Sequence, residues 1–239
     1  KRPASKYLIE KLVMSDNSAL IMGCTGLVGR ALVEELLDTT YYSTIKLVTR
    51  RKLNMNNDRI EEIIVEDFDQ LENFASKMQA QDYFCCLGTT MKIAGSKEQF
   101  KKVDLEYPLI MAAIARKSAG FRQFLVVTAA GANSGSPLFY NQVKGELEEE
   151  LKKMKLPSLM IFRPSLLLGD RDEFRLGEEF AKAISAIFSF FMVGLKRKLW
   201  AIKSKDVAKS MFLIARDQRK GTKVLSSNDM MNRLKSMGF

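Results

Sequence analysis

The sequence contains no histidine, and this absence removes several kinds of chemistry. Without an imidazole, neither a Ser-His-Asp triad nor a Cys-His pair can form, and the commonest protein ligand of transition metals is missing. The three cysteines, Cys24, Cys85 and Cys86, form no C-x-x-C pair, so we expect no zinc or other metal site. Acid–base chemistry in this chain must therefore use other side chains.

Cysteine is also too scarce for a disulfide framework, which favours a reducing, cytoplasmic setting. The longest apolar stretch, from Phe180 to Leu195, is interrupted by Lys182 and is shorter than the roughly 20 residues that a membrane-spanning helix needs. The first residues lack the apolar core of a signal peptide. We therefore expect a soluble cytoplasmic protein in which residues 1–14 are an extension outside the fold.

Positive charge is abundant: 38 lysines and arginines against 28 acidic residues give a formal net charge of +10. Such a balance attracts phosphate-bearing partners. No basic helix with interleaved aromatic residues is present, so we expect no nucleic-acid partner. The apolar segment that ends in basic residues, 180–198, is interpreted as a cover for a substrate pocket, with peripheral membrane contact as the alternative.

Short apolar runs alternate with helical patterns along most of the chain, which predicts an α/β fold with a doubly wound parallel sheet of the Rossmann type. After Pro164 the pattern becomes mixed. We expect one domain over 15–239, with a small C-terminal lobe on the substrate side at about 165–239. The expected strands are Ala19–Met22, Ile45–Thr49, Ile60–Val65, Tyr83–Leu87, Phe124–Thr128 and Leu159–Phe162, and the expected helices are Val28–Leu37, Lys97–Lys117, Tyr140–Met154, one near Glu178–Val193 and one near Lys205–Arg216.

A glycine-rich turn, G-x-x-G-x-x-G, follows the first expected strand and opens the first helix. Gly23 allows the tight turn, Gly26 lets backbone N–H groups approach a pyrophosphate, and Gly29 allows close packing of helix on strand. The alternative, a merely structural turn, is less consistent with the surrounding strand and helix. We expect the dinucleotide to contact Gly23, Thr25, Gly26, Leu27, Val28 and Gly29.

Basic residues end the second expected strand, where an acidic residue would indicate NAD. Arg50 and Arg51 suit the 2′-phosphate of NADP(H), because a guanidinium binds phosphate with paired hydrogen bonds. The alternative for these residues is a solvated basic turn. We therefore expect NADP(H) as the preferred cofactor, with NAD(H) as the alternative. Asp67 and Phe68, which follow the third strand, are predicted to lie near the adenine edge.

Further motifs follow the glycine turn along the chain: Cys86-Leu87-Gly88-Thr89-Thr90, Val103-Asp104, Gly131-Ala132, Tyr140-Asn141-Gln142-Val143-Lys144-Gly145-Glu146 and Phe162-Arg163-Pro164. This series resembles the atypical short-chain dehydrogenase/reductase superfamily, and within it the Tat-interacting-protein oxidoreductase family. The resemblance implies that Leu87, Gly88, Thr89 and Thr90 line the ribose and nicotinamide, and that Arg163 and Pro164 lie at the nicotinamide end. On local sequence alone, an ordinary turn explains the Gly88 segment equally well.

Tyr140 and Lys144 are four residues apart, so on a helix their polar ends share a face. The resemblance implies that Tyr140 is the acid/base, and that Lys144 binds the ribose and lowers the pKa of the tyrosine. The resemblance also implies a third catalytic group, a hydroxyl at the end of the fifth expected strand, for which this chain offers Thr128. Alanine follows at Ala129 where relatives carry serine, so Ser134 or Ser136 is the alternative, and Thr128 could instead serve as a cap.

Two functions are consistent with these residues. The first is an NADPH-dependent oxidoreductase that transfers hydride to or from a small carbonyl or alcohol. The second is a non-catalytic dinucleotide sensor that controls a protein partner.

Overall fold

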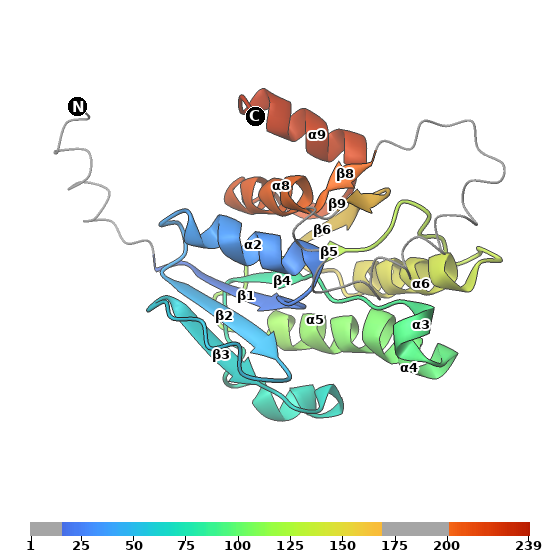
Figure 1. Cartoon of the computed structure of the whole chain (residues 1–239), viewed down its shortest axis with the longest axis horizontal. Coiled ribbons are helices and arrows are strands. Elements are labelled where there is room, and N and C mark those ends of the chain that lie inside the picture. Colours follow the sequence, from blue (N-terminus) through green and yellow to red (C-terminus); the bar gives the residue numbers. More distant parts are fainter. Residues whose placement is uncertain (1–15, 169–200) are drawn as a thin grey trace.

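A computed structural model describes residues 16–168 and 201–239 and contains a seven-stranded parallel sheet (Figure 1). The strand order is β3-β2-β1-β4-β5-β6-β9, so the chain winds outward in one direction from β1 and in the other from β4. The Rossmann-type prediction is confirmed. The strands are β1 (Ser18–Met22), β2 (Thr44–Thr49), β3 (Ile60–Ile64), β4 (Asp82–Cys85), β5 (Gln123–Val127), β6 (Ser158–Arg163) and β9 (Gly221–Ser226).

Helices cover both faces of the sheet, because side chains that alternate along each strand are buried on both sides. In β1, Ala19 and Ile21 pack with α2 (Leu27–Leu37) and α8 (Ser204–Arg216). Leu20 and Met22 belong to the opposite core, with α5 (Tyr107–Lys117) and α6 (Phe139–Lys153). In Figure 1 the sheet lies between α2 and α8 above and α5 below.

The helix expected over Lys97–Lys117 is interrupted. It consists of α4 (Lys97–Lys101), a π-helical turn η2 (Lys102–Glu106), and α5. Pro108 lies in the first turn of α5, has no N–H to donate, and its ring would clash with the carbonyl four residues earlier, at Asp104. The wider π turn accommodates the proline and places Asp104 in the interior.

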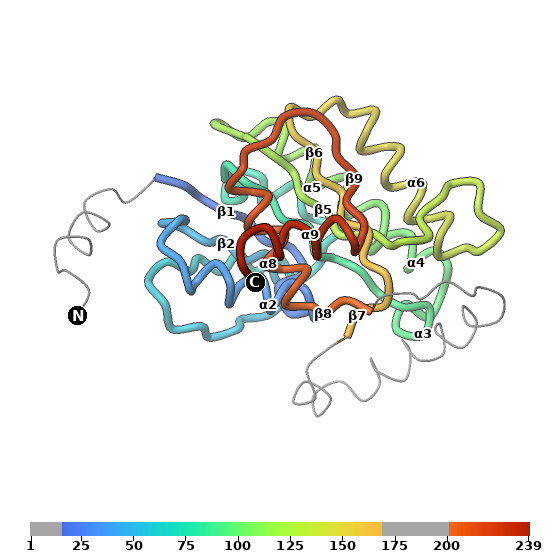
Figure 2. Tube along the Cα trace, turned by 90° about the horizontal axis from the view of Figure 1, so that it is seen from above, coloured from blue at the N-terminus to red at the C-terminus, as the bar shows by residue number. Residues whose placement is uncertain are grey.

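Much of the segment that we expected to form a C-terminal lobe belongs to the layers of the main fold. α8 packs on α2, and β9 adds a seventh strand beside β6 (Figure 2). We did not predict β9, because its residues are almost all exposed and show no apolar alternation. α9 (Ser227–Ser236) follows, and β7 (Leu167–Leu168) pairs with β8 (Ile202–Lys203).

Other predicted segments lie outside the described residues: the extension at 1–14, the helix near 178–193, and the basic residues at 196–198. Two short elements complete the fold, η1 (Phe68–Phe74) and α3 (Met91–Ala94). Among the helices of the described ranges, none has the length and apolar character needed to span a membrane.

Candidate functional site

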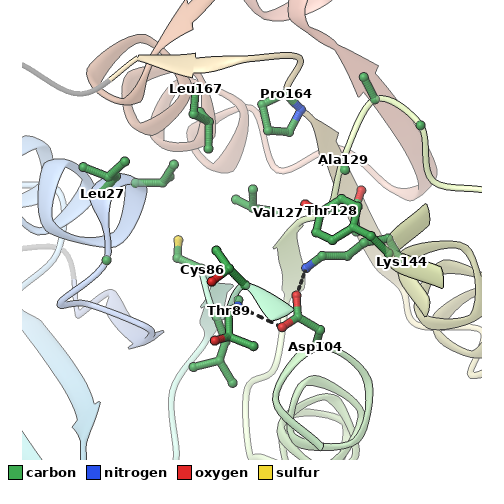
Figure 3. A pocket seen from close by; sticks show the side chains of 18 of the residues that line it. Leu27, Cys86, Thr89, Asp104, Val127, Thr128, Ala129, Lys144, Pro164 and Leu167 are labelled. Carbon is green, nitrogen blue, oxygen red and sulfur yellow. Dashed lines mark hydrogen bonds and ion pairs between the residues drawn. The ribbon is translucent and has the colours of Figure 1, made fainter. Parts of the chain in front are cut away.

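A pocket lies at the carboxyl edge of the sheet, where the strand order reverses between β1 and β4 (Figure 3). This is where open α/β sheets bind ligands. The loops after β1, β4, β5 and β6 build its walls, and α6 provides its polar side. Its lining comprises Gly26, Leu27, Val28, Cys86, Leu87, Gly88, Thr89, Thr90, Asp104, Val127, Thr128, Ala129, Ala130, Gly131, Tyr140, Asn141, Lys144, Pro164, Ser165, Leu166 and Leu167.

The three glycines of the first turn differ in what surrounds them. Gly23 has a φ of +88°, and a Cβ there would lie 2.6 Å from the Cys86 backbone. A Cβ on Gly29 would lie 2.1 Å from the Gly23 carbonyl oxygen, so helix and turn touch there. Gly26, at the N-terminus of α2, has its nearest neighbour at 3.4 Å and lines the pocket.

The first turn of α2 therefore presents backbone N–H groups to the pocket, with no acidic side chain among them. A helix N-terminus of this kind binds phosphate. Gly26, Leu27 and Val28 line the pocket directly, whereas Gly23 and Gly29 shape the backbone from behind and Thr25 is exposed outside the lining. The residues present fit the pyrophosphate of a dinucleotide.

Arg50 and Arg51 follow β2, which pairs with β1 so that Val48 lies opposite Met22 beside the glycine turn. The Thr49 hydroxyl bonds to the backbone of Arg51 and fixes this turn. Both guanidinium groups are exposed, and no ion pair to another described residue involves either. They lie outside the pocket lining, available to an anion at its edge.

Asp67 and Phe68 have local structural roles. The Asp67 carboxylate caps η1 by accepting from Asp69 N. Phe68 is buried and packs edge-on against Tyr107, with ring centroids 5.6 Å apart. Neither residue is among those that line the pocket.

The loop after β4 lies over a buried carboxylate. Leu87, Gly88, Thr89 and Thr90 all line the pocket. The Thr89 backbone N–H donates to Asp104 Oδ2 at 2.8 Å, and the Thr90 hydroxyl caps α3 by accepting from Ile93 N. The structure therefore gives this loop fixed backbone positions beside the pocket.

Helix α6 carries Tyr140, Lys144 and Glu148 at four-residue intervals, which places them on one face. Lys144 Nζ lies 2.6 Å from Asp104 Oδ1, and both side chains are buried. Burial acts to lower the pKa of Lys144, but the Asp104 carboxylate outweighs it and the pKa is raised. Burial also raises the pKa of Tyr140, against the opposing effect of Lys144, so the phenol is protonated near neutral pH.

Thr128 lines the pocket, but its hydroxyl donates to Glu148 Oε1 at 2.7 Å. Glu148 also accepts from Arg163 Nε at 2.9 Å and Nη2 at 2.6 Å. Thr128 therefore has no hydrogen left to donate to a substrate while this bond holds. Arg163 lies outside the pocket lining and is tied to Glu148, whereas Pro164, next along the chain, lines the pocket.

The alternative hydroxyls that we predicted also have other partners. Ser134 donates to the Glu149 carboxylate, and Ser136 accepts from Leu138 N. Neither lines the pocket. A Cβ on Gly145 would lie 2.1 Å from Ser134 N, so the glycine lets the loop after β5 seat closely on α6.

Sequence reasoning missed three polar residues of the lining: Asp104, Asn141 and Ser165. Asp104 and Asn141 were quoted only within the resemblance, where nothing in the pattern distinguishes them from their neighbours. Ser165 is held by Ser227 at the start of α9: Ser165 N donates to Ser227 Oγ at 2.8 Å, and the two hydroxyl oxygens lie 2.9 Å apart. The sequence gives no local signal for this long-range pairing.

Comparison with known proteins identifies the family. Residues 23–179 match the NAD(P)H-binding family. Protein HTATIP2 of Rattus norvegicus is 38% identical over 178 residues, which cover 73% of each chain. Protein FMP52, mitochondrial, of Meyerozyma guilliermondii is 32% identical over 213 residues, which cover 85% of this chain and 88% of that protein.

Solved structures share the fold at low sequence identity. MoeE5 in complex with UDP-glucose and NAD has a TM-score of 0.66 at 14% identity, covering 88% of this chain and 75% of that one. The Bordetella bronchiseptica enzyme WbmF in complex with NAD+ has a TM-score of 0.65 at 14% identity, covering 89% and 73%.

The expected cytoplasmic location is contradicted, because the fungal FMP52 relatives are named mitochondrial. The inference failed because scarce cysteine argues against disulfides and does not separate one reducing compartment from another. The family assignment does not depend on that location. Together, the glycine turn, the sheet order and the sequence matches show that the chain belongs to the NAD(P)H-binding family, as an atypical relative of the short-chain dehydrogenases/reductases.

Proposed function

We propose that this protein is an NADP(H)-dependent oxidoreductase that acts on a small carbonyl or alcohol, with Tyr140 as the acid/base. The observation that carries the proposal is that Tyr140 and Lys144 line the same pocket as Gly26 at the N-terminus of α2. A proton donor and a phosphate-binding helix end are thus placed to meet one dinucleotide and one substrate.

The chain offers groups for each part of the cofactor. The N-terminus of α2 would hold the pyrophosphate, Lys144 and the backbone of Gly88 and Thr89 the ribose, and Arg50 and Arg51 the 2′-phosphate. When bound, the nicotinamide supplies or accepts the hydride. Asp67 and Phe68 remain candidates for the adenine edge only through their backbone, because their side chains are engaged elsewhere.

Tyr140 is suited to donating a proton, since its half-buried phenol has a raised pKa and is protonated at neutral pH. Thr128 is better explained as a positioning residue: by bonding to Glu148, its hydroxyl holds the carboxyl end of β5 against α6. We propose that Tyr140 alone protonates the substrate oxygen.

The described part of the pocket favours an uncharged substrate. Its described lining includes the apolar side chains of Val127, Ala129 and Leu167. Lys144 is the one cation of the described lining, and Asp104 neutralises it. Among the described residues, none offers the pocket an unpaired cation for a carboxylate or phosphate on the substrate.

The names of the FMP52 relatives support a mitochondrial location for this chain.

The test is a screen of aldehydes and ketones in which NADPH absorbance is followed. We expect Tyr140→Phe to lower turnover by about a hundredfold or more while NADPH affinity stays unchanged. Lys144→Met should lower both turnover and NADPH affinity. Equal turnover of wild type and Tyr140→Phe would exclude Tyr140 as the acid.

A non-catalytic NADP(H) sensor that controls a protein partner is the second candidate. The engagement of Thr128 with Glu148, and the alanine at Ala129, favour it. Tight NADPH binding by a wild-type protein that turns over no member of a broad carbonyl panel would support the sensor over the enzyme.

A further inference from the structure

Asp104 is a fully buried carboxylate in the lining of the pocket, and no sequence motif gives it a role. It projects from the π turn η2. One oxygen lies 2.6 Å from Lys144 Nζ, and the other accepts from Thr89 N at 2.8 Å. Figure 3 shows both contacts converging on Asp104. One carboxylate therefore connects α6 with the loop after β4.

Lys144 needs such a partner, because only 4% of its side chain is exposed. A buried ammonium without a counter-charge loses its proton, and its pKa can fall by about 3 to 5 units. The titratable groups that face Lys144 are Asp104 from η2, Tyr140 from its own helix and Cys85 from β4. Of these, Asp104 is the carboxyl group that can supply a full negative charge: burial raises its pKa, and the Lys144 ammonium and the Thr89 N–H oppose that shift.

We propose that Asp104 is a positioning residue that keeps Lys144 charged inside the pocket and fixes the loop after β4 relative to it. The inference rests on the proposed function only where it concerns the cofactor, since Lys144 is taken to bind the ribose. Its electrostatic part concerns the protein alone and can be tested without ligand.

Asp104→Asn keeps the shape of the side chain and an acceptor for Thr89 N but removes the counter-charge. The pKa of Lys144 should then fall well below its ordinary value, because burial is no longer opposed by the carboxylate. A lysine whose pKa is lower in the folded than in the unfolded protein destabilises the fold as pH falls. We therefore expect the Tm of ligand-free Asp104→Asn to rise between pH 6 and 9, relative to the double variant Asp104→Asn/Lys144→Met.

In the wild type, the raised pKa of Lys144 keeps it charged over this range, so its contribution to stability is constant. NADPH affinity gives a second readout. In Asp104→Asn it should weaken by about tenfold from pH 6 to 9 as Lys144 loses its proton, whereas in the wild type Lys144 adds no such trend.

Asp82→Asn is the matched control. Asp82 is equally buried and pairs with Arg122 at 2.8 Å, but it lies at the amino end of β4, away from the pocket. This variant should lose stability without the pH trend that depends on Lys144.

If Asp104→Asn fails to fold, Lys144→Met provides the test. It leaves Asp104 unpaired with a raised pKa, so the Tm of Lys144→Met should fall from pH 5 to 8 relative to the double variant.

The proposal is wrong if the Tm of Asp104→Asn and the Tm of the double variant change with pH in the same way. Where only Lys144→Met folds of the two single variants, the proposal is wrong if its Tm and that of the double variant change with pH in the same way. Unchanged NADPH affinity in Lys144→Met would instead refute the proposed ribose contact. The Tm profiles would still decide the role of Asp104.

Discussion

Thr128→Val separates a positioning role from a catalytic one, because valine keeps the shape of threonine and removes only the hydroxyl. Thr128 is 4% exposed and donates to the charged Glu148 at 2.7 Å. A hydrogen bond to a charged group contributes about 1.5 to 3 kcal/mol to stability. Arg163 still donates two hydrogen bonds to Glu148 in the variant, so the carboxylate stays paired. We therefore expect the free energy of unfolding of Thr128→Val to fall by about 1.5 kcal/mol, near the lower end of that range.

For a domain of this size, such a loss lowers Tm by about 3 to 6 °C. Urea unfolding measures the free energy directly, and the same preparations give turnover with NADPH and the best carbonyl substrate. Thr128→Ser retains the hydroxyl and should keep most of the stability. We expect turnover of Thr128→Val to fall less than about tenfold, since Tyr140 supplies the proton. A hundredfold loss of turnover with unchanged stability would refute the positioning role and make Thr128 a donor to the substrate.

Three further outcomes follow from the pocket. Arg50→Ala or Arg51→Ala should weaken NADPH binding by about tenfold or more and leave NADH binding unchanged, measured by calorimetry; equal losses for both dinucleotides would remove the 2′-phosphate assignment. Nonanal should be reduced with a higher kcat/KM than 9-oxononanoate, in which a carboxylate replaces the terminal methyl group; the reverse order would contradict the uncharged-substrate assignment. Gly29→Ala should destabilise the fold, because its Cβ would lie 2.1 Å from the Gly23 carbonyl oxygen; wild-type unfolding in urea would contradict that packing.

The sequence predicted the sheet well because parallel strands buried on both faces leave an uninterrupted apolar signal. The runs around Ile21, Val48, Phe84 and Val126 fall in the centre of the sheet. β9 escaped prediction for the opposite reason. It is an edge strand with exposed side chains, and its place in the sheet is set by backbone pairing with β6, which has no residue pattern.

The sequence predicts those parts of the pocket whose residues lie close together within one element. Gly26 with the start of α2, and Tyr140 with Lys144, are each fixed by spacing within one element. The pairings that determine what those groups can do are long-range: Lys144 with Asp104, and Thr128 with Glu148. No periodicity in the sequence reports which buried charges meet, so the engagement of Thr128 became evident only from the fold.

Calorimetric titration of the wild type and Gly26→Val with NADPH tests the central claim most directly. The backbone of Gly26 has φ −79° and ψ 170°, which any residue adopts, and the nearest atom to an added Cβ lies 3.4 Å away. The variant should therefore fold, while its side chain occupies the space that the pyrophosphate needs. The account predicts NADPH binding by the wild type and none by a folded Gly26→Val. Equal NADPH affinity in the two proteins, or no binding by either, would contradict it.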